Sequence, residues 1–143
     1  MKSFALTIVS QEQQLYMGRA VKLFVSSLFG ELEILYGHAR LLAQLAPAPV
    51  WIEKEEQTQE ALVVFGGVLE VQPDKCIILA DSAIRANDLD EAKALNAKIE
   101  AEHILKQRSI STIDDSVVRN ELAYASAQLR VIKYLLGKQI KIK

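Results

Sequence analysis

The sequence has a single cysteine, Cys76, among 143 residues, which excludes an internal disulfide and any zinc site built from several cysteines. No run approaches the roughly 18 apolar residues that a membrane-spanning helix needs. Neither sign of charge dominates, because 17 Lys and Arg stand against 18 Asp and Glu. This balance argues against a strongly basic nucleic-acid-binding protein. We therefore expect a reducing, cytoplasmic compartment, no leader segment, and membrane association only through a partner.

Half of the residues are apolar, which is enough for a real hydrophobic core. The length fits one ordinary domain, or one compact domain with an appendage too small to fold alone. Charge divides unevenly at Ala86: residues 1–86 carry 7 basic and 10 acidic side chains, whereas residues 87–143 carry 10 and 8. The hydrophobic period changes at the same place, so we predict two modules with this boundary.

Residues 1–86 are predicted to form an antiparallel β-sandwich or flattened barrel, because short β-rich runs alternate with turn signals. We interpret Gly18 as a break in the chain and the Pro47-Ala48-Pro49 segment as a corner. Gly66-Gly67 lies inside a strand pattern, where glycine marks a bulge or a close approach of two backbones. The predicted strands cover residues 4–9, 21–26, 32–34, 41–45, 50–52, 61–65, 68–71 and 76–79.

Residues 87–143 are predicted to form an α-helical hairpin. The first helix opens near Asp88, with small and apolar residues in two neighbouring stripes, and ends near Arg108. The second carries a seam with steps of three and four residues from Val118 to Leu136, after which Gly137 is expected to end the helix. Such a hairpin is thin, and we expect it to be marginal alone and able to change partners.

No arrangement of residues indicates an active site. Gly66-Gly67 lacks the lysine and hydroxyl residue of a phosphate-binding loop, and His38 and His103 lie in different modules without the spacing of metal ligands. Cys76 is expected to be buried or half-buried in a strand, with no histidine placed to activate it. An enzyme is therefore the weakest of the functional readings.

Basic side chains follow one side of the second predicted helix at Arg119, Arg130 and Lys133. Charges on a helix most often form a solvated face, and this remains the simpler interpretation. The alternative is that this basic strip, beside an apolar seam that can detach, docks on an acidic protein surface.

Five segments together resemble a known family nearly from end to end: Gly30–Leu42 (GELEILYGHARLL), Gly66–Pro73 (GGVLEVQP), Leu79–Arg85 (LADSAIR), Asp88–Ala92 (DLDEA) and Ala127–Ile132 (AQLRVI). Their order and spacing are similar to the epsilon subunit of the bacterial rotary ATP synthase. The resemblance implies a β-sandwich followed by a helical hairpin, in agreement with the change of period. It also implies a non-catalytic subunit of the rotor, held peripherally at the cytoplasmic face of the bacterial plasma membrane.

Partners follow from the resemblance. The sandwich is implied to bind the gamma subunit and to rest on the ring of membrane rotor subunits, with Glu31 facing the ring and His38 near gamma. The hairpin is implied to fold against the sandwich, or to extend along gamma and restrain ATP hydrolysis. In the extended state Arg119, Arg130 and Lys133 are our candidates for contact with acidic residues of the catalytic beta subunits.

The sequence departs from the family pattern in the first of these segments. Glu33, Tyr36 and Arg40 stand where a glycine and two prolines are usual, so we expect this loop to have a different shape.

Some relatives bind ATP through an Asp-x-x-Arg-Ala motif, which here contains Asp90, Lys93 and Ala94. Lysine keeps the charge but lacks the two-pronged guanidinium. Of the further arginines of the second helix, one position is Ser126 and the other is Arg130. The expectation is therefore no cofactor, or weak ATP binding. A free-standing ATP-sensing module stays the alternative function, and this reduced set of arginines argues against it.

Overall fold

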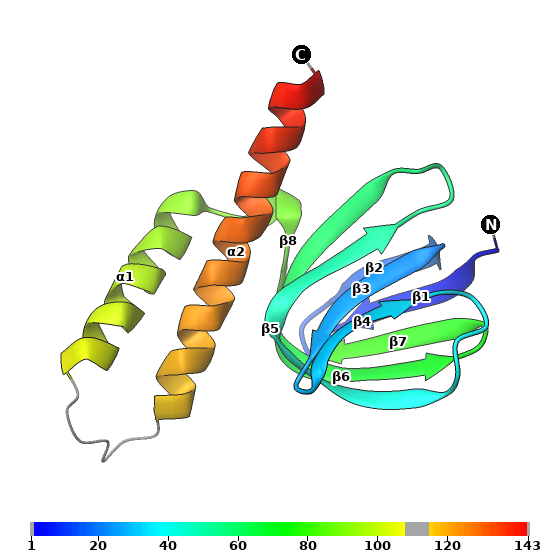
Figure 1. Cartoon of the computed structure of the whole chain (residues 1–143), viewed down its shortest axis with the longest axis horizontal. Coiled ribbons are helices and arrows are strands. Elements are labelled where there is room, and N and C mark those ends of the chain that lie inside the picture. Colours follow the sequence, from blue (N-terminus) through cyan, green and yellow to red (C-terminus); the bar gives the residue numbers. More distant parts are fainter. Residues whose placement is uncertain (1, 108–114, 143) are drawn as a thin grey trace.

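The structure is a computed structural model that describes residues 2–107 and 115–142 (Figure 1). A β-rich domain is followed by two helices, which confirms the predicted fold class. The strands are β1 (Phe4–Val9), β2 (Gln14–Ala20), β3 (Lys22–Ser27), β4 (Gly30–Ile34), β5 (Leu41–Glu53), β6 (Gln59–Gln72), β7 (Lys75–Ala80) and β8 (Ala83–Arg85). A 3-10 turn, η1 (Ala86–Asp88), leads to helices α1 (Glu91–Gln107) and α2 (Asp115–Ile142).

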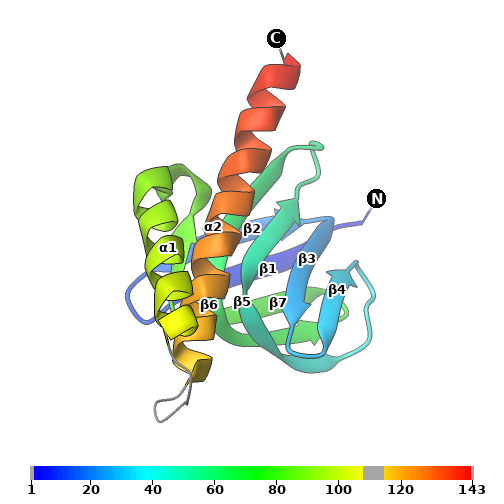
Figure 2. The ribbon, with the colours of Figure 1, turned by 60° about the vertical axis from the view of Figure 1, so that its left-hand side comes forward.

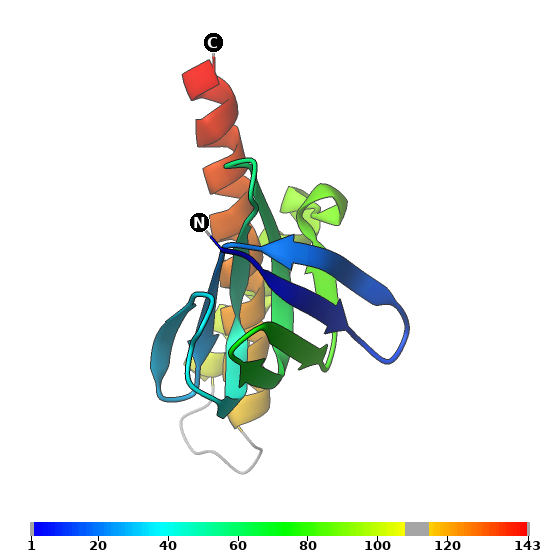
Figure 3. The ribbon, with the colours of Figure 1, turned by 90° about the vertical axis from the view of Figure 1, so that its right-hand side faces the viewer.

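Two long strands, β5 and β6, supply both layers of the sandwich. Their residues 41–45 and 67–72 pair with each other in one layer, which continues through β7 and β1 to β2. Their residues 47–53 and 59–65 pair in the other layer, together with β3, β4 and β8. Figures 1 and 3 show the two strands curving from one layer into the other.

The bends between the layers contain the prolines predicted to form a corner and the glycines predicted to form a bulge or a close approach. Pro47 and Pro49 lie inside β5, opposite Phe65 and Val63, so the strand continues through the predicted corner. Both prolines fall in the part of β5 that β3 leaves unpaired, so their missing N–H groups interrupt no bond to β3. Gly67 makes the predicted close approach, because a Cβ there would lie 2.2 Å from the carbonyl oxygen of Leu79.

Three features of the sheet differ from the sequence prediction. Residues 14–20 form β2, and Gly18 lies within that strand opposite Leu6, so it does not break the chain. Strand β8 was not predicted, because three residues are too short for a periodic pattern. Strands β1 and β7 pair in parallel, whereas the other pairs among the described residues are antiparallel.

The sandwich core consists of the inward-facing residues of both layers. Leucine, isoleucine and valine dominate it, with Phe4 and Cys76 also buried, which confirms the prediction for the thiol. No polar or charged side chain is buried among the described residues. Apolar burial therefore supplies the main stabilisation of the domain.

In the helical hairpin, α2 lies between α1 and the sandwich (Figure 2). Asp90 caps α1 by accepting a hydrogen bond from the backbone N–H of Lys93 at 3.1 Å, so the helix begins at Glu91, three residues after the predicted opening near Asp88. The small residues Ala94 and Ala101 of α1 are buried, as expected for a close-packed pair of helices.

Helix α2 does not end at Gly137 but continues to Ile142, past the end of the sandwich in Figure 1. One interior glycine costs a helix only about 1 kcal/mol, and the residues that follow it here are good helix formers. Within the part of the chain that the structure describes, neither helix is both long and apolar enough to cross a bilayer.

Candidate interaction surfaces

The outer face of the layer β2–β1–β7–β6–β5 carries exposed apolar side chains. Along one row the register places Met17, Thr7, Ile77, Glu70 and Leu42 side by side across five strands. The next row holds apolar residues on three adjacent strands, Val9, Leu79 and Val68.

We call Met17, Leu42, Val68 and Leu79 the apolar face. Their side chains are 66%, 72%, 38% and 56% exposed, respectively. Several large apolar side chains exposed on one face of a sheet are typical of a protein–protein contact, because their exposure to water is unfavourable. The face therefore fits a protein partner.

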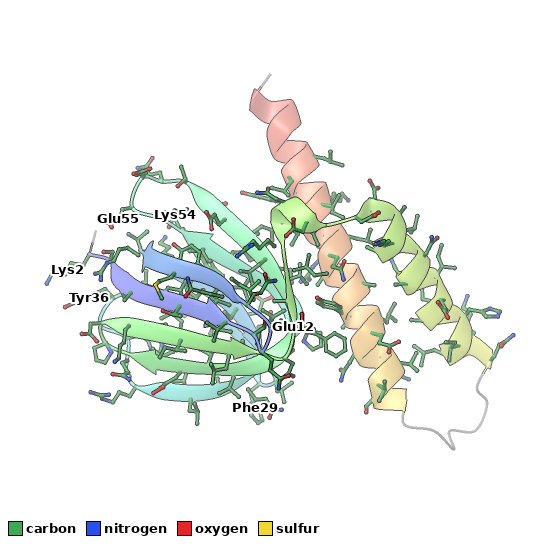
Figure 4. The ribbon with its side chains drawn as sticks, turned by 180° about the vertical axis from the view of Figure 1, so that it is seen from behind. Lys2, Glu12, Phe29, Tyr36, Lys54 and Glu55 are labelled. Carbon is green, nitrogen blue, oxygen red and sulfur yellow. The ribbon has the colours of Figure 1, made fainter. Side chains whose placement is uncertain are left out.

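The turn between β3 and β4 ends in two further exposed apolar residues, Leu28 and Phe29, the second of them 98% exposed. The Ser27 hydroxyl donates to the carbonyl oxygen of Gly30 at 2.7 Å and accepts from the N–H of Phe29 at 3.1 Å. These bonds fix the turn, so Phe29 projects from one edge of the sandwich on a rigid support (Figure 4). Glu31 follows directly in the strand and is exposed.

His38 lies in the loop between β4 and β5 and is half-buried. Its Nδ1 atom is 2.7 Å from the carbonyl oxygen of Ala39, and its backbone N–H donates to the carbonyl of Leu35. The N–H of Gly37 donates to the carbonyl of Pro73 at 2.7 Å, which ties this loop to the turn between β6 and β7. The loop thus borders the apolar face where β5 begins.

Two of the three departures from the family pattern have partners within the chain. The Nζ atom of Lys2 lies 5.1 Å from the ring centroid of Tyr36, and these residues lie at the end of the sandwich away from the hairpin (Figure 4). Glu33 faces Lys22 across β3 and β4, with 3.9 Å between their charged atoms. Arg40 is exposed. The structure places Glu33 in β4, and Tyr36 and Arg40 in the loop that follows it.

The basic strip of Arg119, Arg130 and Lys133 is exposed along α2. Arg130 lines a cavity of about 460 Å³ between α2 and β3–β4, together with Glu31 and Glu33. The structure therefore brings together two predicted site residues, Arg130 and Glu31, that were assigned to different partners. No ion pair within 4 Å joins them among the described residues.

The residues of the ATP motif have structural roles in this conformation. The Asp90 carboxylate caps α1, Lys93 is exposed, and Ala94 is buried in the hairpin. Among residues 2–107 and 115–142, no ion pair within 4 Å joins Asp90 to Lys93 or Arg130.

Helix α2 packs against β5 and β6 through aromatic and small residues. The rings of Trp51 and Tyr134 meet edge to face with centroids 4.8 Å apart, and those of Phe65 and Tyr124 do so at 4.9 Å. Burial raises the pKa of Tyr124, and a hydrogen bond with Ser82 offsets part of that effect. Val131 is fully shielded from solvent and is the most deeply buried of the α2 side chains whose burial the structure describes.

No catalytic or metal site emerges from the described residues. They contain no group of three His, Cys, Asp or Glu side chains able to hold a metal ion. Burial raises the pKa of Cys76 to about 11, which makes the thiol a poor nucleophile at neutral pH.

The apolar face and Phe29 were missed as candidates, although the sequence carries a signal for the face. The run Ile77-Ile78-Leu79 has apolar residues on both sides of a strand, and this pattern is typical of a strand that is covered on both faces. Since the sandwich core covers only one side, the other side needs a separate partner. Nothing in the sequence around Phe29 indicates its exposure.

Two family descriptions match this chain: "ATP synthase, Delta/Epsilon chain, beta-sandwich domain" over residues 3–86, and "ATP synthase, Delta/Epsilon chain, long alpha-helix domain" over residues 87–133. The ATP synthase epsilon chain of Chromohalobacter salexigens is 45% identical over 138 residues, covering 96% of this chain and 97% of that one.

Two solved structures share the fold. A chain of the Euglena gracilis mitochondrial ATP synthase, in a structure of its OSCP, F1 and c-ring, superposes with a TM-score of 0.78 at 22% identity, covering 91% of this chain and 81% of that one. A chain of the central stalk and c-ring of the Tetrahymena thermophila enzyme gives 0.60 at 13% identity, covering 90% and 96%.

Proposed function

The chain belongs to the delta/epsilon family of ATP synthase subunits, and on that premise we propose that it is a non-catalytic subunit of the central rotor stalk. In this role it couples proton flow to ATP synthesis without carrying out chemistry itself. It lies peripherally at the cytoplasmic face of the bacterial plasma membrane and is attached only through the complex.

The observation that carries this proposal is the apolar face. A free-standing protein gains nothing from leaving Leu42, Met17 and Leu79 more than half exposed, whereas a permanent subunit buries such residues against its neighbour. We assign this face, bordered by the His38 loop, to the gamma subunit. The Phe29 turn and Glu31 at the edge of the sandwich are assigned to the ring of membrane rotor subunits.

The hairpin restrains ATP hydrolysis in this proposal. When it leaves the sandwich and extends along gamma, Arg119, Arg130 and Lys133 meet acidic residues of the catalytic beta subunits. Their exposure along one helix supports the assignment, because a basic strip can approach an acidic surface without first losing buried partners.

Co-purification with gamma tests the assignment of the apolar face. Burying one leucine contributes about 1.5–3 kcal/mol, so Leu42→Glu should weaken gamma binding at least tenfold. The matched control is Leu28→Glu, which places the same charge at a 54%-exposed leucine in the turn assigned to the ring. Gamma binding that is equal in the two variants would refute this assignment.

Reconstitution with the catalytic assembly tests the restraint of hydrolysis separately. Deleting residues 87–143 should raise ATPase activity, and replacing Arg119, Arg130 and Lys133 with alanine should raise it while leaving gamma binding intact. Unchanged ATPase activity in both variants would contradict the inhibitory role but not the place of the sandwich in the rotor.

A further inference from the structure

The contact between α2 and the sandwich is unusually rich in aromatic rings. Trp51 and Phe65 project from β5 and β6 and meet Tyr134 and Tyr124 of α2 in two edge-to-face contacts. We call these four residues the aromatic clasp. Between the two contacts lie Val63, Ala127 and Val131, which are almost completely buried.

The clasp also has polar links, and they are neutral. The Tyr134 hydroxyl donates to the side-chain oxygen of Gln59 at 2.5 Å, and Tyr124 is hydrogen-bonded to Ser82. Both links join uncharged groups, so neither depends on an ion pair.

Among residues 2–107 and 115–142, no ion pair within 4 Å joins the hairpin to the sandwich. The three recorded among the described residues, Lys22–Glu33, Lys22–Glu53 and Lys54–Glu60, all lie inside the sandwich. Arg130 shares a cavity with Glu31 and Glu33 but forms no ion pair with them within 4 Å, so solvent and salt screen that attraction.

We propose that the aromatic clasp sets the equilibrium between the closed and open hairpin, and that this equilibrium is nearly independent of ionic strength. Opening would expose Trp51, Phe65 and the apolar residues between them, so the isolated chain rests closed. Capture of the open hairpin by an acidic partner, which rests on the proposed function, would instead weaken with salt. Raising the ionic strength therefore shifts the assembled subunit toward the closed form.

Alkylation of a buried thiol measures opening in the isolated chain. Val131→Cys places a thiol of similar size at a fully buried position of α2, which iodoacetamide reaches only when the helix leaves the sheet. The natural Cys76 serves as an internal reference, because it is buried in the sandwich core and reacts only when the sandwich unfolds. The neutral reagent keeps the reaction itself insensitive to salt.

Tyr124→Ala and Tyr134→Ala should each raise the alkylation rate at position 131 at least tenfold and leave the Cys76 rate unchanged. Tyr36→Ala is the matched control, since it removes a tyrosine at the far end of the sandwich and should change neither rate. Between 50 mM and 0.5 M salt, the rate at position 131 in the parent protein should change less than threefold.

Three results would overturn the proposal: tyrosine variants that react no faster than the parent, a tenfold rise of the rate at position 131 with salt, or a rise at Cys76 in parallel with position 131. The last of these would show global unfolding. These outcomes are independent of gamma binding, so failure of the clasp and failure of the proposed function can be distinguished.

Discussion

Gly67 is the position where one added methyl group should be most damaging. Its φ is +137°, and a Cβ there would lie 2.2 Å from the Leu79 carbonyl oxygen and 2.8 Å from the Ala80 Cα atom. Both are backbone atoms of β7, so relief requires the two strands to separate. The residue lies at the bend where β6 passes between layers, and β6 pairs with three other strands.

The loss of stability expected for Gly67→Ala is the sum of two contributions. Holding a non-glycine residue at such a φ costs about 1–3 kcal/mol, and forcing apart packed atoms costs about 1–3 kcal/mol more. A loss of about 4 kcal/mol is a large part of the 5–15 kcal/mol that stabilises a typical domain. With a urea dependence of about 1–3 kcal/mol per molar, the midpoint of unfolding should fall by roughly 2 M.

The chain provides a matched control in Gly30, whose φ of +135° is nearly the same but whose added Cβ would meet no atom within 4 Å. Gly30→Ala should therefore cost only the conformational contribution, about 1–3 kcal/mol. Urea unfolding, followed by circular dichroism and by the fluorescence of Trp51, the single tryptophan, measures both variants. Equal destabilisation by the two substitutions would refute the close contact as the cause.

Three further predictions concern individual side chains. Burial raises the pKa of Cys76 from 9.0 to about 11, so the folded state holds the thiol proton more tightly than the unfolded state does. The contribution of this proton to the free energy of unfolding should therefore be lost as the pH rises from 9 to 11. Urea midpoints should then fall less steeply over this range in Cys76→Ala than in the parent. Lys93→Arg should tighten ATP binding measured by calorimetry, because arginine restores the two-pronged guanidinium. Micromolar ATP binding by the parent protein would contradict the expectation that lysine at this position weakens binding. Lys54→Met removes the Lys54–Glu60 pair, which is 33% and 49% exposed, and should change the unfolding free energy by less than about 1 kcal/mol.

The alternation of apolar residues identified most strands, because burial on one face imposes a period of two. This pattern failed to identify the full strand where a strand contains glycine or proline, residues that usually end a strand. Gly18 stands in β2 with the Tyr16 hydroxyl 3.3 Å from where its Cβ would be, so the ring fills the space beside the glycine. Pro47 and Pro49 are tolerated in β5 because β3 does not pair there, and only the assembled sheet reveals that gap.

The sequence predicted one apolar seam along the second helix, whereas α2 buries two sets of residues. Val118, at the start of the predicted seam, is buried, as is Ala125 further along it, but Leu136 at its predicted end is 49% exposed. A second set, Tyr124, Ala127 and Val131, packs against the sheet, and its spacing of three and four residues is also helical. Alanine and tyrosine carry a weak hydrophobic signal in sequence, so the seam that holds the hairpin was the harder one to find.

The apolar face and the surface that contacts α2 belong to different halves of the same two strands, β5 and β6. In β6, Phe65 contacts α2, whereas Val68, three residues later, belongs to the apolar face, and Gly66 and Gly67 lie between them. In β5, Trp51 and Leu42 are separated in the same way by the segment with the two prolines. Under the proposed function, gamma on the apolar face would not have to displace the hairpin, and the hairpin could leave the sandwich while gamma stays bound. Gly67 lies at the bend between the two surfaces, so the close approach of β6 and β7 there would fix their relative placement.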